Sequence, residues 1–555
     1  MLPELARSLE THQVENQAPP LAYDAWETDR PLREAVARFG GEAAAGAAGD
    51  TRLGELGKLV GGELMELGRL ANENRPKPRI FDRYGHRLDE VEFHPSYHQL
   101  MALAIDHEIP SFGWTHADTP GAHVVRMAKG YLYNQADQGS ACPLTMTYAC
   151  VPTLRHQQEL AKAWLPKVLS RRYDPKPGPL ADKSGVTVGM GMTEKQGGSD
   201  VRANSTRATP LERSGPGEAY ALVGHKWFFS APMCDAWLVL AYAGGGLSCF
   251  LMPKILPDGS RNAVHVQRLK DKLGDWSNAS SEVELRGALG WLVGQEGRGV
   301  ANILEMVALT RQDCMIGSAG LMRQAIVQAL HHCRHRKAFG KRLIEQPLMA
   351  NVLADLALES EAHLVLTARI AQAVDAQARD AAQRALGRIA TAIGKYWVCK
   401  RAPAFVNEAQ ECLGGAGYVE ESPMPRLYRQ APLNSIWEGS GNIQCLDVLR
   451  ALGREPEALH ALMAELERAR GAHRLLDQEL DALPGELADQ ETLEPRARRV
   501  VERLALTLSA ALLAEGDSDV FSNYCETRLG DRFASFGVLR PGAPLAKLIE
   551  RAFPG

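Results

Sequence analysis

The 555-residue sequence shows no marked excess of either charge and contains no Cys-x-x-Cys pair. Its 63 Lys and Arg against 67 Asp and Glu give a formal net charge of −4, so no global positive field draws the whole protein to nucleic acid or an anionic membrane. The ten cysteines are not closely spaced, which argues against a disulfide framework or a zinc site. We therefore predict a cytoplasmic protein with buried thiols and no metal.

Membrane and export signals are also missing. The first residues, 1–4, are not a basic region followed by an apolar core, so no secretory signal is predicted. One long uncharged window, 236–253, is interrupted by three glycines at 244–246, which indicates a β-hairpin and not a membrane span. The composition, 45% hydrophobic and 23% charged, is that of a globular protein of several domains.

Apolar spacing divides the chain into four parts. In 54–72 the apolar residues repeat with a helical period, which predicts a single helix with one apolar stripe. After residue 184 the period becomes that of strands, and it becomes helical again after residue 299. The expected strands cover 185–192, 219–229, 236–243, 247–256, 262–269 and 281–285. The predicted domains are a helical domain (1–182), a middle β-domain (183–294), a helical bundle (295–451) and a C-terminal helical region (452–555).

The resulting fold class is mainly α with a central antiparallel β-domain and a C-terminal helical extension. Taken one at a time, the conspicuous motifs have ordinary explanations. The glycine-rich segment 192–200 is either an anion-binding turn or a decorated β-turn with a solvated Glu and Lys. Residues 331–341 form a basic helix end suited to the helix dipole or to a pyrophosphate. Glu438 either starts a helix favourably or sits in a dry pocket as a general base.

Five motifs in a fixed order nevertheless resemble the acyl-CoA dehydrogenase family. They are GMGMTEKQGGSDV (189–201), KWFFS (226–230), RKAFG (336–340), LGGAGY (413–418) and NSIWEGSGNI (434–443). The first and last of these, and the extra segment after Arg450, are similar to the AidB-like flavoproteins of the bacterial adaptive response to DNA alkylation. The resemblance covers residues from about 100 to 450.

The resemblance implies a homotetramer that binds FAD between the β-domain and the bundle. In such an assembly, Arg336 and Phe339 contact the adenosine half of a neighbouring subunit's cofactor, and Phe228 covers one face of the flavin. The cofactor-binding residues that the resemblance implies are Gly191, Met192, Thr193, Gly198, Ser199, Phe228, Phe229, Ser230, Arg336, Phe339, Gly415, Ile436, Trp437, Gly439, Ser440 and Asn442.

The resemblance also implies a catalytic role for Glu438, which would remove the α-proton of an acyl-CoA thioester while hydride leaves the β-carbon. Some relatives carry the base on the long helix, at the position of Thr310, but a threonine cannot serve as that base. Glu438 is therefore the matched candidate. Glu411, Asn442 and Phe228 depart from the residues that many relatives carry.

AidB-like proteins are expected to bind double-stranded DNA, without sequence specificity, through the C-terminal helices. Residues 458–555 contain 12 Lys and Arg against 16 Asp and Glu, which argues against a uniformly basic platform. A local patch of Arg496, Arg498, Arg499 and Arg503 is the candidate DNA site. The alternative is a solvated helix whose arginines pair with acidic neighbours such as Glu494 and Glu502.

Three functions are compatible with the sequence. The favoured one is an FAD-containing protein that binds DNA and protects it during alkylation stress, with weak acyl-CoA dehydrogenase activity. The second is a metabolic acyl-CoA dehydrogenase for short or branched acyl-CoA, and the third is a flavin-free scaffold.

Overall fold

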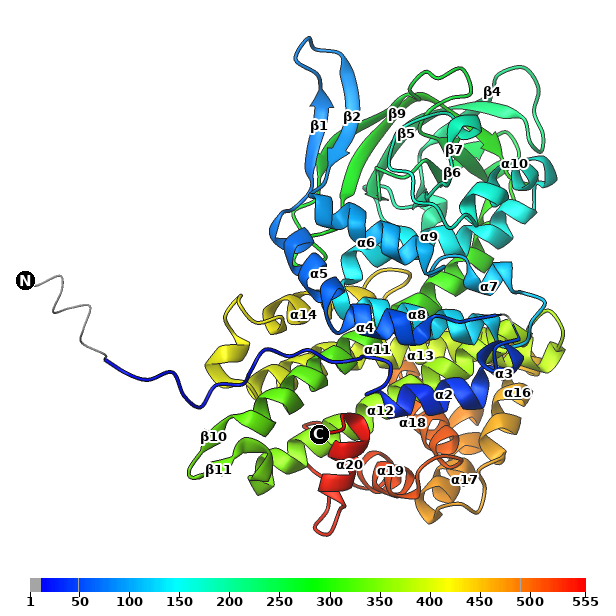
Figure 1. Ribbon diagram of the computed structural model, residues 1–555. Coiled ribbons are helices and arrows are strands. Elements are labelled where there is room, and N and C mark those ends of the chain that lie inside the picture. Colours follow the sequence, from blue (N-terminus) through cyan, green and yellow to red (C-terminus); the bar gives the residue numbers. More distant parts are fainter. Residues whose placement is uncertain (1–10, 48, 490) are drawn as a thin grey trace, which may run out of the picture.

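The computed structural model describes residues 11–47, 49–489 and 491–555, and the N-terminal residues examined for a secretory signal lie outside that part. The β-domain forms one end of the molecule, the long helices form its middle, and the C-terminal helices form the opposite end (Figure 1). The predicted fold class, mainly helical with a central β-domain, is confirmed. Within the described residues, we find no helix with the length and apolar character needed to cross a membrane.

Short helices build the N-terminal part. They are α2 (Arg30–Phe39), α3 (Gly41–Ala44), α4 (Leu53–Val60), α5 (Glu63–Glu73), α6 (Pro95–Asp106), α7 (Phe112–Thr115), α8 (Ala122–Ala136), α9 (Gln138–Arg155) and α10 (Gln158–Val168), with a hairpin of β1 (Lys77–Phe81) and β2 (Arg87–Glu92). The single helix predicted over 54–72 is wrong, because Gly61 and Gly62 separate α4 from α5. A Cβ on Gly61 would lie 1.7 Å from the carbonyl oxygen of Tyr23, so the chain approaches too closely there for another residue.

The β-domain has seven strands. They are β3 (Val188–Gly191), β4 (Arg207–Pro210), β5 (Ala219–Ser230), β6 (Ala236–Ala243), β7 (Gly246–Pro253), β8 (Val264–Leu269) and β9 (Ser280–Leu292). The uncharged window forms the predicted hairpin, with β6 antiparallel to β7. Pairings of β5 with β9, β9 with β7, β7 with β6, β6 with β4 and β4 with β5 close the sheet into a ring.

Two details of the β-domain differ from the expectation. The sheet is not wholly antiparallel, since β3 runs parallel to β6 from Val188↔Ala236 to Gly191↔Val239. The long excursion through β4 and β5 gives the chain room to return in the same direction, which a tight hairpin cannot do. Strand β4 was missed because its four residues are too few to show a period of two.

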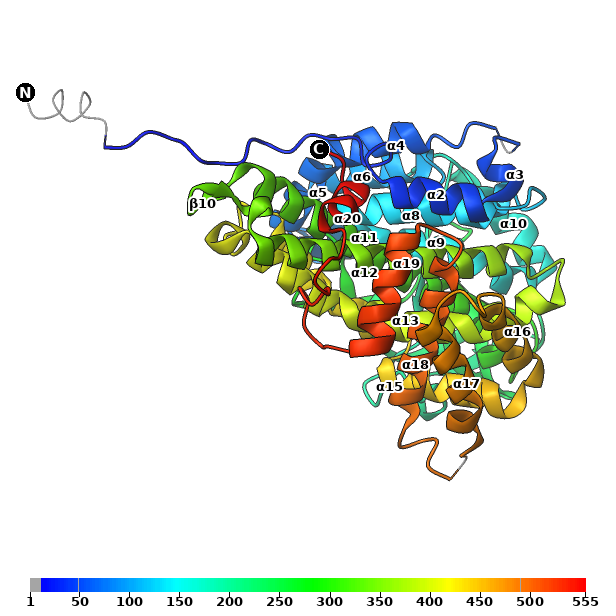
Figure 2. The same cartoon turned by 90° about the horizontal axis from the view of Figure 1, so that it is seen from below.

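Long helices form the bundle behind the β-domain. They are α11 (Gly299–His335), α12 (Pro347–Ala376), α13 (Ala381–Glu411), α14 (Met424–Gln430) and α15 (Gly441–Arg454), with a small hairpin of β10 (Lys337–Ala338) and β11 (Lys341–Arg342) after α11. The hairpin projects from the body of the molecule, beside the extended N-terminal segment (Figures 1 and 2). Asn16 fixes that segment to the hairpin, because its side chain and Lys337 exchange two hydrogen bonds of 2.7 and 3.0 Å.

The C-terminal region packs against the bundle. It contains α16 (Pro456–Glu467), α17 (Arg474–Ala488), α18 (Ala497–Leu513), α19 (Ser518–Tyr524) and α20 (Leu545–Ala552). A buried arginine, Arg528, forms ion pairs of 2.6 Å with Asp355 and 2.8 Å with Glu359 of α12. This region is therefore bound to the bundle by desolvated charge pairs as well as by apolar contacts.

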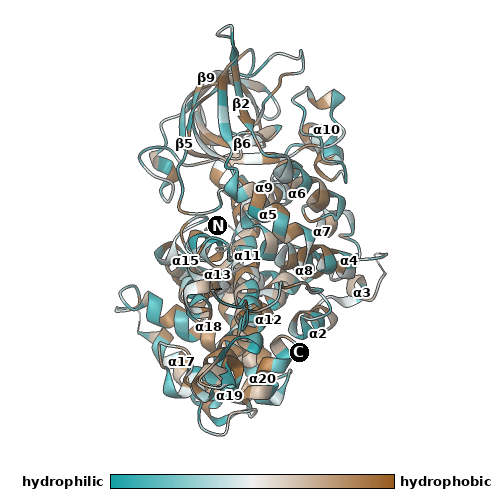
Figure 3. Ribbon diagram, turned by 60° about the vertical axis from the view of Figure 1, so that its left-hand side comes forward, coloured by the Kyte–Doolittle hydropathy of each residue, from teal (hydrophilic) through white to brown (hydrophobic). Residues whose placement is uncertain are grey.

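The described buried apolar residues form two clusters. One lies within the helical parts, and the other lies within the β-domain together with α9 and the start of α11. Figure 3, in which hydrophobic residues are brown, shows such residues in both parts. Met190, Met192 and Trp437 pack against the second cluster from the side of the bundle boundary. Two predicted site residues, Met192 and Trp437, therefore lie where the two cores adjoin.

Candidate active site

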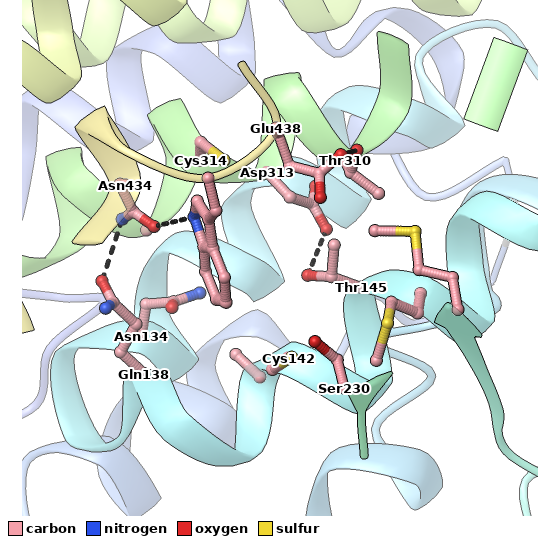
Figure 4. A pocket seen from close by; sticks show the side chains of 15 residues that line it. Asn134, Gln138, Cys142, Thr145, Ser230, Thr310, Asp313, Cys314, Asn434 and Glu438 are labelled. Atoms are coloured by element: carbon pink, nitrogen blue, oxygen red, sulfur yellow. Dashed lines mark hydrogen bonds between the residues drawn. The ribbon is translucent and has the colours of Figure 1, made fainter. Parts of the chain in front are cut away.

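Glu438 lies on the loop between a 3₁₀ turn, Leu433–Ser435, and α15. Its carboxylate faces a small cavity of about 40 Å³ at the boundary between the β-domain and the bundle (Figure 4). Residues of α8, α9, β3, β5 and α11 and of the Glu438 loop line this cavity: Asn134, Gln138, Ala141, Cys142, Thr145, Met146, Met190, Ser230, Thr310, Asp313, Cys314, Gly317, Asn434, Trp437 and Glu438. Elements far apart in the sequence thus converge on one carboxylate.

The Glu438 loop is held in an uncommon backbone conformation. Glu438 has a φ of 57°, a left-handed value that costs a residue with a Cβ on the order of 1 kcal/mol. Its carbonyl oxygen accepts 3.0 Å hydrogen bonds from Arg311 and Gln444. The buried Lys395 ammonium donates to the carbonyl oxygens of the two flanking residues, Trp437 at 2.8 Å and Gly439 at 2.6 Å. These side chains fix the direction in which the carboxylate points.

Thr310 of α11 donates a 2.6 Å hydrogen bond to the Glu438 carboxylate. Burial raises the pKa of Glu438 above its ordinary value, and the Thr310 hydrogen bond and the charges of Lys395 and Arg311 oppose part of that rise. A carboxylate with a raised pKa is a stronger base, which is what proton abstraction beside a thioester requires. Thr310 thus orients the Glu438 carboxylate, although a threonine cannot itself act as the base.

The polar side chains of the cavity wall are already hydrogen-bonded to one another. Thr145 donates 2.7 Å to Asp313, which also forms a bidentate pair with the buried Arg126. At the other end, Asn434 donates to Gln138 at 2.9 Å and accepts from the indole N–H of Trp437 at 2.9 Å (Figure 4). Because these groups satisfy one another, they shape the cavity rigidly.

The glycine-rich loop after β3 is organised around a buried ion pair. Glu194 and Lys226 are both fully buried, with Oε1 and Nζ 2.8 Å apart. Burial alone would raise the pKa of Glu194, but Lys226 and the hydrogen bonds of Ser205 and Thr206 lower it to about 2. The alternative interpretation of this segment, a turn with a solvated Glu, is therefore wrong for Glu194. Glu194 instead anchors the loop, in which Gly198 and Ser199 are exposed.

Gly191, Met192, Thr193, Gly198 and Ser199 lie along β3 and this loop. A Cβ on Gly198 would lie 2.5 Å from the Thr193 hydroxyl, and one on Gly191 would meet the Phe229 ring at 2.6 Å. Both glycines therefore permit close packing. Gly198 and Ser199 are exposed and have room to contact a ligand, whereas Gly191 is buried.

Strand β5 turns successive side chains to opposite faces. Phe229 is buried and packs on Trp237 with ring centroids 4.9 Å apart, so its side chain belongs to the β-domain core and only its backbone is left for a ligand. Phe228 is half exposed, with the Lys270 ammonium 4.5 Å from its ring centre. Ser230 reaches the Glu438 cavity. The alternation separates a core residue from two predicted cofactor contacts.

The residues predicted to act between subunits lie away from Glu438. Phe339 is 99% exposed at the tip of the β10–β11 hairpin, with a left-handed φ of 51°. Arg336 donates 2.7 Å to the carbonyl oxygen of Asn16. Gly415 is exposed in the turn Gly414–Gly417. None of the three lines the Glu438 cavity, as a role toward another subunit's cofactor requires.

The remaining predicted cofactor residues surround Glu438 in the sequence. Ile436 is 62% exposed, and Trp437 lines the cavity. Gly439 has a φ of 92°, and a Cβ there would lie 2.7 Å from Nε2 of Gln444. Ser440 and Asn442 are exposed at the start of α15, and Asn442 accepts a 2.8 Å hydrogen bond from Arg498. Arg498, which was predicted to bind DNA, therefore contacts Asn442, which was predicted to bind FAD.

The predicted DNA patch is largely neutralised. Arg496, Arg499 and Arg503 all pair with the single carboxylate of Glu486, at 2.7, 2.9 and 2.6 Å. Arg503 also pairs with Glu479 at 2.9 Å. The pairing partners are Glu479 and Glu486 of α17 and Asp489 just after it, and not Glu494 or Glu502 as the charge pattern had indicated. Of the four arginines, Arg499 keeps a largely exposed side chain, and Arg498 forms no ion pair with any described residue.

The residues at the boundary suit a flavin. Exposed apolar side chains, Phe228 of the β-domain and Ile436 of the bundle, offer surface for a planar ring. The open backbone of 197–199 and the Thr193 hydroxyl offer donors for ring or phosphate oxygens. The Glu438 carboxylate, whose pKa is raised, lies at the same boundary. The donor chemistry and the apolar surface thus fit FAD.

Comparisons with known proteins agree with this geometry. Three family models match the chain: the adaptive response protein AidB N-terminal domain over 16–175, the acyl-CoA dehydrogenase middle domain over 189–288 and the acyl-CoA dehydrogenase C-terminal domain over 297–453. The chain is 44% identical to AidB of Escherichia coli (strain K12) over 527 residues, covering 94% of this chain and 95% of that protein.

Two further comparisons come from Caenorhabditis elegans. Acyl-CoA dehydrogenase family member 11 is 30% identical over 506 residues, covering 84% of this chain and 80% of that protein. The crystal structure of ACDH-11 in complex with C11-CoA has a TM-score of 0.83 at 26% identity and covers 96% of each chain. The chain therefore belongs to the acyl-CoA dehydrogenase family of FAD-dependent oxidoreductases acting on CH–CH groups. Within it, the chain groups with the AidB-like proteins.

Sequence reasoning missed three supporting side chains. Thr310 was considered only as a failed base, and the buried Lys395 and Lys226 were given no role in the sequence interpretation. A lysine within an apolar helical run was the available signal for Lys395, since lysine is almost never fully buried without a partner.

Proposed function

We propose that the protein oxidises short or branched acyl-CoA thioesters between Cα and Cβ, with Glu438 as the catalytic base. The observation that supports this proposal is the Glu438 carboxylate, directed into a cavity by Thr310 and raised in pKa by burial. FAD, when bound, supplies the hydride acceptor. Met192, Thr193, Gly198, Ser199 and Ser230 are the residues that would hold it.

The chain's own residues then perform binding and proton transfer. The Glu438 carboxylate takes the α-proton, while Thr310 donates to its Oε2 and keeps the carboxylate aligned. Lys395 and Arg311 hold the loop through backbone carbonyls, so the base does not swing away between turnovers. The surrounding side chains exclude water, which keeps the carboxylate weakly solvated and basic.

The size of the cavity favours a small acyl group. A space of about 40 Å³ bounded by Asn134, Gln138 and Asn434 has no room for a long alkyl tail without movement of the walls. The worm relative's structure carries C11-CoA, so a longer chain enters that protein. We expect isobutyryl-CoA or isovaleryl-CoA to react faster here than C11-CoA.

The decisive experiment is anaerobic mixing of the FAD-loaded protein with acyl-CoA thioesters of increasing chain length, followed by the visible spectrum of the flavin. Bleaching by short and branched thioesters, with the enoyl-CoA product identified by mass spectrometry, supports the proposal. No bleaching with any member of the series contradicts it.

We also propose a second function, sequence-nonspecific binding of double-stranded DNA and its protection during alkylation stress. Its support is the match to the adaptive response protein AidB N-terminal domain and the 44% identity to AidB of E. coli. Arg498 and Arg499 are the candidate contacts, because Arg496 and Arg503 are drawn into ion pairs with little exposure. Retardation of duplex DNA with affinity that falls steeply as salt rises is the test.

Assembly as a homotetramer and a cytoplasmic location complete the proposal. A fully exposed Phe339 on a projecting hairpin supports assembly, since large apolar side chains at such tips mark interaction sites. Sedimentation of wild-type protein and Phe339→Asp, with FAD content measured in parallel, tests it. Loss of both the tetramer and the cofactor is expected, and an unchanged tetramer would contradict the assignment.

A further inference from the structure

Asp275 is a buried acid that lies behind the wall of the Glu438 cavity. It belongs to the loop between β8 and β9, is 1% exposed, and does not itself line the cavity. Both oxygens of its carboxylate accept from Nε2 of Gln138, at 3.1 and 3.2 Å, and Gln138 is their only hydrogen-bond donor among the described residues. A loop of the β-domain is therefore joined, through one carboxylate, to a cavity residue at the start of α9.

A chain of hydrogen bonds connects Asp275 to the residue before Glu438. Oε1 of Gln138 accepts 2.9 Å from Nδ2 of Asn434, and Oδ1 of Asn434 accepts 2.9 Å from the indole N–H of Trp437. The last three members of this chain all line the cavity, and Figure 4 shows the two amides facing each other. The Asp275 carboxylate therefore reaches the side chain of Trp437 through two buried amides.

The two ends of the chain give it a single direction. An ionised carboxylate only accepts hydrogen bonds and an indole N–H only donates, whereas an amide has one accepting end and one donating end. With Asp275 at one end and Trp437 at the other, only the observed orientation of both amides satisfies every group. Turning either amide over would place N–H against N–H or oxygen against oxygen, which is costly where water is excluded. The charge of Asp275 thus helps to determine how Trp437 is held.

Two neutral acceptors favour the same orientation. The carbonyl oxygen of Gln430 accepts from Nε2 of Gln138 at 3.4 Å, and the Ser318 hydroxyl accepts from Nδ2 of Asn434 at 3.1 Å. A hydrogen bond to an ionised acceptor is roughly twice as strong as one between neutral groups. We therefore expect the loss of the Asp275 charge to disturb the chain more than the loss of either neutral contact.

We propose that Asp275 is a positioning residue for the Glu438 base, acting through the hydrogen-bond chain that ends at Trp437. The positioning of a base rests on the dehydrogenation proposed above, whereas the orientation of the Trp437 indole can be measured without any substrate. A failure of the hydrogen-bond chain is therefore distinguishable from a failure of the dehydrogenase function.

The electrostatic surroundings of Asp275 make the chain sensitive to pH. Burial raises the pKa of Asp275 to about 7. Lys272 of the same loop and Arg426 of α14 lower it, and Asp137 just before α9 raises it. Burial raises the pKa of the nearby Cys142 thiol to about 12, so that thiol stays neutral in this range. Asp275 is ionised above about pH 7 and protonated below it, and protonation removes the acceptor-only end of the chain.

The test is ¹⁹F NMR of the full-length, FAD-loaded protein labelled with 5-fluorotryptophan, in which the Trp437 resonance is the one missing from Trp437→Phe. Wild type and Glu438→Gln should show a Trp437 resonance that shifts with a midpoint near pH 7, because both keep Asp275. In Asp275→Asn this shift should disappear, and flavin bleaching by isovaleryl-CoA should slow about tenfold, since a displaced base reacts more slowly. A Trp437 resonance that titrates in Asp275→Asn as in wild type, or an unchanged bleaching rate, would overturn the proposal.

Further variants separate positioning from general stability. Asp271→Asn, at a side chain of the same loop that is 91% exposed, is the matched control and should match wild type in both measurements. Gln138→Leu breaks the chain but keeps Asp275, and it should make the Trp437 resonance insensitive to pH even if Asp275→Asn folds poorly. Combining the two substitutions should shift that resonance no further, because both residues act in one chain. Normal titration of the resonance in Gln138→Leu would refute the proposal.

Discussion

The Glu438 cavity and the arginine patch, whose ion pairs join α17 to α18, both contain charged side chains. They differ in whether those charges are already paired. Among the described residues, the Glu438 carboxylate receives one side-chain hydrogen bond and no direct ion pair, so it is available to a substrate. In the patch, Glu486 is shared by three arginines. Burial alone would raise the pKa of Glu486, but Arg503, Arg499 and Arg496 lower it. The comparison shows that partners, more than residue type, decide which charges remain available.

Replacing the base should give the largest effect. We expect Glu438→Gln to keep FAD but reduce the rate of flavin bleaching by acyl-CoA by about 10³-fold or more, because a neutral amide cannot accept the α-proton. Stopped-flow absorbance under anaerobic conditions measures this rate. Glu457→Gln, at an exposed glutamate of α16, should behave as wild type. Normal turnover in Glu438→Gln would show that Glu438 is not the catalytic base.

Within the arginine patch, Arg503 and Arg499 should differ in their contribution to stability, because their side chains differ in burial. Arg503→Met should lower the free energy of unfolding by about 2 kcal/mol, since it leaves two poorly solvated carboxylates without their shared partner. Arg499→Met, at a side chain that is 67% exposed, should change it by less than about 0.5 kcal/mol. Chemical denaturation of both variants measures the difference. Equal effects would mean that the patch is not organised by Glu479 and Glu486.

The Thr310 hydrogen bond allows the role of Glu438 to be tested through the pH dependence of activity. That bond lowers the pKa of Glu438, so Thr310→Val should raise it and move the acid limb of kcat/KM to higher pH. Activity requires the carboxylate, and it should therefore rise as pH increases through the raised pKa. Thr145→Val, which removes a hydroxyl from the same cavity that bonds Asp313 instead, should leave the limb in place. A limb unmoved by Thr310→Val would contradict the positioning role.

The smallest effect is expected on DNA. Reversing both Arg498 and Arg499 to Glu should weaken duplex binding about fivefold at ~0.1 M salt and reduce the salt dependence, at every sequence tested. Reversing Arg450 and Arg454, exposed arginines of α15, is the matched control. Equal losses in both pairs would indicate a general charge effect, and no loss in either would place DNA binding elsewhere.

Much of the fold could be predicted because it is encoded in local period and motif order. The switch from helical to strand spacing near residue 184 and back near 299 corresponds to β3 through β9 followed by α11. The break at Gly61 and the parallel pairing of β3 with β6 could not be predicted, because each depends on a contact with a segment remote along the chain. The short strand β4 could not be predicted because its four residues are too few to show a period of two.

The candidate site shows the same division. The acid and the glycines around it are visible in the sequence, whereas Thr310 bonds a carboxylate 128 positions away and Lys226 neutralises Glu194 from another strand. Charge counting described the C-terminal region as net acidic, but it could not assign Arg496, Arg499 and Arg503 to Glu486.

The sequence by itself determined the chemistry that is present: which residues can accept a proton, which turns need glycine, and which family the order of motifs belongs to. The tertiary structure alone decided which of these groups are free to act. A side chain's solvation and its partners depend on segments that are remote along the chain, and those two properties set the pKa of Glu438.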